Sequence, residues 1–171
     1  MTAKPEAWQR GPVEGVPALL QPVAHALLNA QEQVEEAIRD LTPQQLATRP
    51  NGAASIEYHV RHAIGSLDRL FTYARGESLT DDQRAYLKAE VSPLEGGISP
   101  GDLFTMLQRG ISKAIEQLRH TDESALTEPR EIGRAKLPST AIGLLFHGGE
   151  HTARHAGQVV TTAKIVRGTA S

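Results

Sequence analysis

The chain has 171 residues, a formal net charge of −2 and no cysteine. Its length suits a single domain, and the missing cysteine excludes disulfides, thiolate nucleophiles and cysteine-based zinc sites. The near-neutral charge without a Lys/Arg cluster gives no support for nucleic-acid binding, and no apolar run is long enough for a membrane span. We therefore expect a cytoplasmic protein with no membrane partner, built mainly from aliphatic side chains.

The first segment, residues 1–16, has no sustained period, and we predict an N-terminal arm there followed by one helical domain over residues 17–171. From about Pro17, apolar residues recur at spacings of three and four, which is typical of an amphipathic helix. Pro22 is tolerated only in a first helical turn, so the regular helix should begin near Gln21. The apolar positions are Leu20, Val23, Leu27, Ala30, Val34, Ile38 and Leu41.

A restart signal follows at Thr42, which can form a capping box with Gln45 and so predicts one short helical turn. The Pro and Asn-Gly punctuation of residues 49–54 predicts a loop. Ser55 can then cap a second long helix that ends near Gly76. Its core face is marked by Ile56, Val60, Ala63, Ile64, Leu67, Leu70 and Phe71.

Two further helices are predicted before residue 120. A capping box at residues 80–83 begins a lesser helix that runs through Glu90, and its charges suit a surface position. Ser99 and Pro100 begin the third long helix, which should stop near His120. Its apolar stripe consists of Leu103, Met106, Leu107, Ile111, Ala114 and Leu118.

Residues 121–138 are predicted to form a connection, and a fourth long helix should run from Ser139 or Thr140 to about Val166. No segment shows a convincing strand alternation, so the fold class is all-α. The connections are long, which fits a bundle with a crossover as well as a plain up-down-up-down arrangement. We predict a four-helix bundle with a crossover connection and short extra helices.

The fourth helix carries His147, His151 and His155 at spacings of four residues. Adjacent members of this row would stack on one helical face, close enough for two imidazoles to hold one metal ion. His59 and His62 lie on the margin of the second helix, so two polar margins could meet across the bundle. Such a row is often only a solvated face, but facing bundle helices commonly build metal sites. An open site with three histidines suits Zn, Ni, Fe or Mn.

Two separated motifs resemble the DinB-like superfamily, which is sometimes grouped with the YfiT-type metal-dependent hydrolases. The family pattern has a Ser, a His seven residues later, and a terminal-helix His-x-x-x-His-x-Gly-Gln. Here Ser55 leads to His62 at that spacing, and residues 151–158 supply the second motif. The resemblance covers residues 19–166 and is specific for the fold and the metal triad, but not for the substrate.

The resemblance implies that His62, His151 and His155 hold a divalent metal, a choice among five histidines that spacing alone leaves open. Zn or Ni is expected first, with Fe and Mn as further candidates. His59 and His147 are then expected beside the metal ligands or in the substrate pocket. Their ordinary alternative is an exposed or hydrogen-bonded side chain on the pocket rim.

Other polar residues near these motifs are expected at the surface. Glu150 should point about 100° away from His151 and act as a surface charge rather than a general base. Arg61, Arg69 and Arg154 are predicted to be solvated, with binding of an anionic substrate as the alternative. Glycine is unfavourable inside a helix, so close helix packing is the expected reason for Gly143, Gly148, Gly149 and Gly157.

The first functional hypothesis is a metal-dependent enzyme acting on a small molecule, either a hydrolase or a transferase that uses a low-molecular-weight thiol as cofactor. The catalytic species would be a metal-bound water or thiolate. The resemblance implies this range, because the superfamily includes thiol-dependent S-transferases and isomerases, and it also implies a homodimer. The alternative is a non-catalytic binding or stress-response protein whose metal site is structural or vacant.

Overall fold

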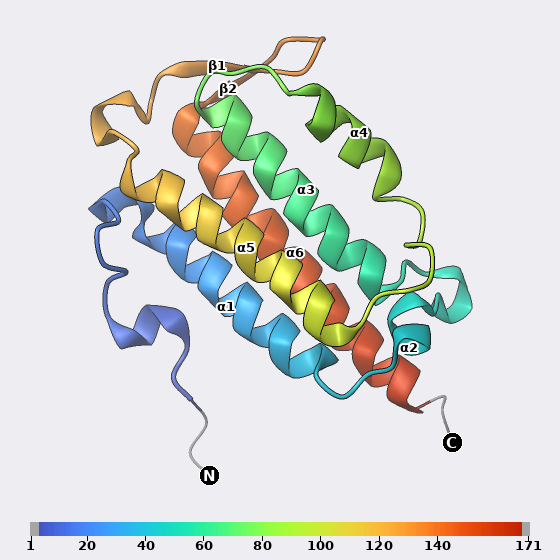
Figure 1. The fold of residues 1–171 in the computed structure, drawn as a ribbon. Helices are drawn as coiled ribbons and strands as arrows, with labels where there is room; N and C mark the ends of the chain where they lie inside the picture. The colour runs from blue at the N-terminus through green and yellow to red at the C-terminus, as the bar shows by residue number, and fades with distance from the viewer. Residues whose placement is uncertain (1–3, 169–171) are drawn as a thin grey trace.

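Four long helices form a bundle in the computed structural model, which describes residues 4–168 (Figure 1). They are α1 (Gln21–Ile38), α3 (Ile56–Ala74), α5 (Pro100–Arg119) and α6 (Ala141–Gly168). The predicted all-α fold is confirmed, and each long helix begins within two residues of its expected start. The apolar stripes read from the sequence form one core, since Leu27, Leu67, Ile111 and Leu145 are all at most 2% exposed.

The order of the helices around the bundle places α1 and α3 on one diagonal and α5 and α6 on the other, because α6 and α5 each pack against both α1 and α3. In Figure 1, α3 and α5 run in the same direction. The chain therefore has to return along the bundle after α3, and it does so through α4 (Asp81–Ala89), which lies against α3. The predicted crossover connection is confirmed, and α4 is part of it.

Helix starts follow the capping signals of the sequence. The Thr42 hydroxyl and the Gln45 side chain form both halves of a capping box at α2 (Pro43–Ala47). The Ser55 hydroxyl accepts a hydrogen bond of 3.2 Å from the Tyr58 backbone N–H at the start of α3. These bonds satisfy N–H groups that a helix leaves without partners at its first turn.

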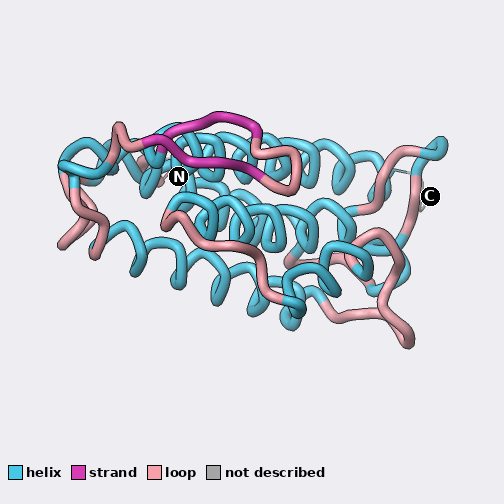
Figure 2. Tube along the Cα trace, turned by 90° about the horizontal axis from the view of Figure 1, so that it is seen from above, coloured by secondary structure: helices cyan, strands magenta, loops and turns pink. Residues whose placement is uncertain are grey.

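A small hairpin lies in the segment that was predicted only as a connection between two long helices. Strands β1 (Pro129–Ile132) and β2 (Leu137–Thr140) pair antiparallel. Each has only four residues, too short for alternation to be recognised in the sequence. The hairpin lies beside the end of α3 (Figure 2), where the Arg130 Nε donates 2.8 Å to the Ala74 carbonyl.

The N-terminal segment lies along α1 (Figure 1) and contains more structure than expected. It includes the short 3₁₀ helix η1 (Ala7–Arg10), whose Ala7 is 3% exposed and donates its backbone N–H to Asn29 Oδ1 at 2.7 Å. Three more 3₁₀ turns occur in the described chain, η2 (Ala18–Leu20), η3 (Pro50–Gly52) and η4 (Glu123–Ala125). A boundary between arm and domain at residue 16 stays a prediction.

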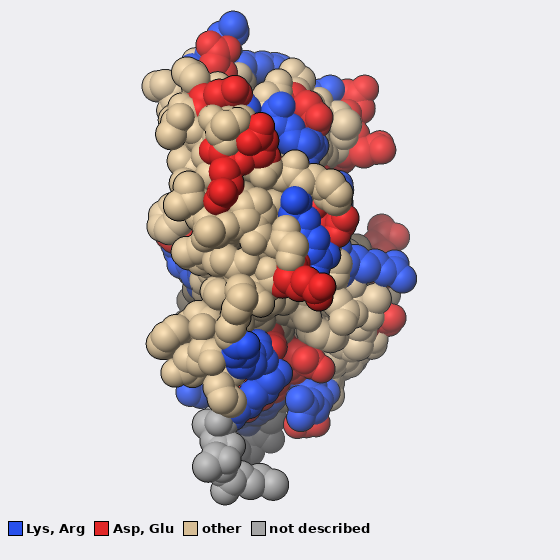
Figure 3. Space-filling view, turned by 90° about the vertical axis from the view of Figure 1, so that its left-hand side faces the viewer, with Lys and Arg blue, Asp and Glu red and all other residues tan. Residues whose placement is uncertain are grey.

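The surface mixes charges of both signs. On the face drawn in Figure 3, acidic and basic side chains are interspersed and separated by broad uncharged areas. None of the helices over residues 4–168 is long and apolar enough to cross a membrane.

Candidate metal centre

The close contact of α6 with its neighbours depends on two glycines. A Cβ at Gly148 would lie 2.8 Å from Cε2 of Phe71 on α3, and one at Gly149 would lie 3.2 Å from Cγ1 of Val23 on α1. These two positions confirm the predicted use of glycine for close packing. Gly157 does not share it, because no atom lies within 4 Å of a Cβ built there. The α3–α6 approach brings the histidines of the two helices together.

His62, His151 and His155 form one cluster, and one ring nitrogen from each lies within 4.8 Å of the others. The ring centroids of His151 and His155 are 4.6 Å apart, and that of His62 lies 5.2 Å and 4.8 Å from them. Two metal–nitrogen bonds of about 2.1 Å span at most about 4.2 Å, so an ion would require the rings to rotate slightly inward. Within residues 4–168 this is the one group of three or more such donors.

His62 is oriented by a buried carboxylate. Its Nδ1 lies 2.8 Å from Oε1 of Glu90, which is 1% exposed and accepts two further bonds of 3.0 and 3.1 Å from the Arg69 guanidinium. A carboxylate bonded to one ring nitrogen of a histidine fixes the orientation of the ring and leaves the other nitrogen, here Nε2, for a metal ion. The expectations of a surface Glu90 and a solvated Arg69 were wrong, because the two charges neutralise each other inside the protein.

His155 uses its Nδ1 in the same way, against a different partner. Its Nδ1 lies 3.0 Å from Nδ1 of His59, so one of the two rings donates a hydrogen bond to the other. Burial, and then the nearby charge of His151, lower the pKa of His155 to about 3. Burial also lowers the pKa of His59. His59 therefore lies directly against a member of the cluster, and its 7% exposure does not fit a pocket rim.

His151 contains the site's unsatisfied polar atom. Its Nδ1 is buried and has no hydrogen-bond partner. Burial, followed by the charges of His62 and His147, lowers the pKa of His151 to about 4, so the ring is neutral near pH 7. A buried ring nitrogen without a partner is costly unless something binds it, and a metal ion is the partner that neutral imidazole favours. The residues present thus fit the metal that the resemblance implies.

The first histidine of the α6 row lies outside the cluster. The His147 ring meets that of His151 edge-on at 5.4 Å, and its side chain is 49% exposed. Its Nδ1 is 3.3 Å from Glu150, which also pairs with Arg154. The Arg154 guanidinium lowers the pKa of Glu150, although slight burial opposes it. Glu150 is thus paired with the exposed Arg154, in agreement with its expected role as a surface charge.

Two other residues near the cluster escaped sequence reasoning. Tyr58 lies one turn before His62, and their rings stack at 5.4 Å and 10°. Arg61 was expected in solvent, but it is 4% exposed and donates to Glu57 at 3.0 Å and to the Ala89 carbonyl at 2.9 Å. The i, i+4 spacing of Glu57 and Arg61 was a usable signal for their ion pair. The contact of Arg61 with Ala89 fastens the segment that holds Glu90.

Comparison with known proteins agrees with this architecture. A family model described as the DinB superfamily matches residues 26–159. The chain belongs to the DinB superfamily. A crystal structure of a conserved protein from Enterococcus faecalis has the same fold, with a TM-score of 0.66 and 21% identity over 87% of this chain and 97% of that one. No curated protein is significantly similar to the chain.

Proposed function

We propose that this DinB-superfamily chain is a metal-dependent enzyme that holds one divalent ion through His62, His151 and His155. The single observation that supports this most strongly is the state of the ring nitrogens. Among the contacts of residues 4–168, each ring keeps at least one nitrogen without a hydrogen-bond partner, and the unpartnered Nδ1 of His151 is buried. Three imidazoles thus lie together, each with a ring nitrogen that a metal ion could take.

The number of donors supports catalysis over a structural role. Structural zinc sites usually have four protein ligands, whereas catalytic sites keep a position open, and this cluster offers three donors. An ion bound here would act as a Lewis acid that makes a water or a thiol more acidic. Glu90 would hold the proton on His62 Nδ1, and His59 would fix the ring of His155. A hydrolase or a transferase using a low-molecular-weight thiol fits this arrangement.

The competing proposal is a non-catalytic binding protein with a structural or vacant site. One observation favours it, since the donor group in the described chain contains only histidines and no carboxylate that could serve as a general base. Coordination distinguishes the two proposals. An exchangeable water on a three-histidine ion, seen in the cobalt-substituted protein, supports the enzyme, whereas a closed four-ligand site supports the structural role.

The first test is the metal content of protein purified without an affinity tag. We expect about one divalent ion per chain, most readily Zn or Ni, and its loss in His151→Ala. The matched control is His120→Ala, because the His120 side chain is 74% exposed and lies outside the cluster. Full metal content in His151→Ala would overturn the assignment of the site. Assays with common thiols and electrophiles, with and without metal, then test the reaction class.

The oligomeric state is a separate part of the proposal. The homodimer implied by the family resemblance is expected to give twice the chain mass by light scattering in solution. A monomer mass at micromolar concentration would contradict it without affecting the metal assignment.

A further inference from the structure

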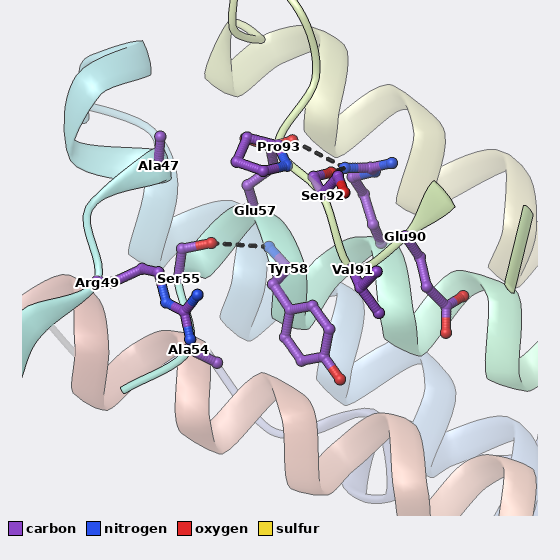
Figure 4. Close-up of a pocket in the computed structure, with 11 residues that line it drawn as sticks. Ala47, Arg49, Ala54, Ser55, Glu57, Tyr58, Glu90, Val91, Ser92 and Pro93 are labelled. Atoms are coloured by element: carbon purple, nitrogen blue, oxygen red, sulfur yellow. Dashed lines mark hydrogen bonds and ion pairs between the residues drawn. The ribbon is translucent and has the colours of Figure 1, made fainter. Parts of the chain in front are cut away.

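A pocket of about 410 Å³ lies next to the histidine cluster, at the end of the bundle where α3 begins (Figure 4). This volume falls in the range of small-molecule sites. One wall comes from the α2–α3 connection, another from the first turns of α3, and the third from the segment after α4. The lining residues include Arg49, Ala54, Tyr58, Arg61, Glu90 and Val91.

The charges around this pocket favour an anion. Both of its carboxylates already have a cationic partner, Glu57 in Arg61 and Glu90 in Arg69. Arg49, in contrast, is exposed and makes no ion pair within residues 4–168. Its guanidinium makes only a long bond of 3.4 Å from Nε to the Ala53 carbonyl. An unpaired guanidinium therefore remains at the pocket.

The start of α3 also favours an anionic ligand. The first turn of the 19-residue helix α3 contributes to the wall, and the positive end of its dipole favours negative charge. Arg61, also in the wall, is 4% exposed, and its bonds to Glu57 and to the Ala89 carbonyl hold the start of α3 against the segment after α4.

Much of the remaining lining is apolar, although it also includes Ser55 and Ser92. Ala47, Ala54 and Pro93 line the pocket together with Val91, which is 63% exposed. In Figure 4 the Tyr58 ring lies between Arg49 and Val91, with its hydroxyl pointing towards α6. The same ring stacks on His62. A ligand body lying on Tyr58 would thus extend from the guanidinium to the edge of the candidate metal centre.

We propose that this pocket binds a small organic carboxylate, with the carboxylate at Arg49 and the apolar body on Tyr58 directed towards His62. The direction of the body rests on the proposed metal function, but the carboxylate site does not. The ligand class follows from one cation in excess beside an apolar surface of limited size. It defines the substrate class for the proposed enzyme as small molecules that carry a carboxylate.

The carboxylate site is tested in metal-free protein, titrated with 3-phenylpropionate and with the neutral analogue 3-phenylpropanol by NMR. We expect the carboxylate to bind about tenfold more tightly than the alcohol, which is the effect of one charge-assisted bond. Arg49→Met should remove that difference, and Arg49→Lys should keep part of it. The control is Arg134→Met, another exposed arginine, located in the hairpin at the other end of α3. Equal affinity for the two probes, or an equal loss in the control, would overturn the proposal.

The direction of the ligand is tested separately in protein loaded with Co²⁺. Protons on the phenyl ring of 3-phenylpropionate should relax faster than those next to the carboxylate, because the ring lies closer to the paramagnetic ion. The reverse order would overturn the proposed direction. If wild-type protein takes up no Co²⁺, the proposed metal function fails, whereas the carboxylate result in metal-free protein still stands or falls independently.

Discussion

The contact between α3 and α6 has an apolar end, at Phe71 and Gly148, and a polar end, at the histidines. At one end Phe71, 2% exposed, packs against the bare backbone of Gly148. At the other end His59 and His62 of α3 face His151 and His155 of α6. The same two helices are therefore held together by close apolar packing at one end and by contacts between polar side chains at the other.

The difference indicates that the polar end is the less stable of the two. Apolar packing needs no partner beyond the helices themselves, but the histidine end requires every ring nitrogen to be satisfied. Two of those nitrogens are bonded by Glu90 and His59, and the buried Nδ1 of His151 remains unsatisfied. The polar end should thus be the one that responds to pH and metal, and the apolar end should respond only to shape.

The largest effect is expected from Glu90→Gln, which removes the charge that organises the polar end. Arg69 would lose its carboxylate partner in a buried site, so the free energy of unfolding should fall by about 3 kcal/mol. Metal affinity should fall by about 10- to 100-fold, as expected when the partner of a ligating histidine is lost. Urea denaturation and metal titration measure the two effects.

The matched control for that change is Glu77→Gln, since Glu77 is 55% exposed and pairs with Arg75 at the surface. An exposed pair contributes about 0–1 kcal/mol. If Glu90→Gln costs no more than Glu77→Gln, the buried network does not organise the polar end, and the contrast between the two ends disappears.

The next effect is a loss of stability in acid, measured on protein kept metal-free with a chelator. Burial lowers the pKa of His151 to about 4 and that of His155 to about 3, from an ordinary value of 6.5. Between pH 6.5 and about 4 these rings take up protons only when the chain unfolds, so falling pH favours the unfolded state. The free energy of unfolding should decrease over that window and be restored above it.

Substitution assigns this acid effect to the polar end. His155→Gln should flatten the decrease between pH 6.5 and 4, whereas His147→Gln should leave it unchanged, because the His147 side chain is 49% exposed. Equal slopes in wild type and His155→Gln would place the acid sensitivity elsewhere in the molecule.

The apolar end is tested by a pair of glycine substitutions in α6. Gly148→Ala places a methyl 2.8 Å from Phe71, and the cost of overpacking should exceed the gain in helix propensity by about 1–2 kcal/mol. Gly157→Ala meets no atom within 4 Å and should instead stabilise by about 0.5–1 kcal/mol. Thermal unfolding distinguishes the two signs, and a stabilising Gly148→Ala would show that Phe71 moves aside freely.

The same contrast explains what could be predicted from the sequence. The long helices and their caps follow from local signals, so Ser55 and the apolar stripe around Leu67 place α3 correctly. Glu90 gave no such signal, because its partners His62 and Arg69 are 28 and 21 residues away and meet it only after folding. The four-residue strands of the hairpin were too short to recognise.

Local sequence patterns predict only the part of the cluster that lies on α6. The α6 row is visible as a spacing of four, but that spacing treats His147 like His151 and His155. The choice of His62 came from resemblance to the DinB-like motifs, and no periodicity distinguishes it from His59. Both residues lie near the cluster, and their separate roles depend on which ring nitrogen is bonded, a property of the tertiary structure.

The smallest effect concerns the helix starts that position the polar end. Ser55→Ala removes the bond to the Tyr58 N–H and should destabilise the protein by about 1 kcal/mol. Ser99→Ala at the start of α5 removes the equivalent bond to the Asp102 N–H, on a helix that contributes no histidine to the cluster, and should cost about as much. Both are measured by urea denaturation, with metal affinity as the second readout.

If Ser55→Ala also weakens metal binding by more than about threefold while Ser99→Ala does not, the first turn of α3 positions Tyr58 and His62 as well as capping the helix. Unchanged affinity in both would limit the cap to helix stability, and Glu90 would then be the main residue that orients His62.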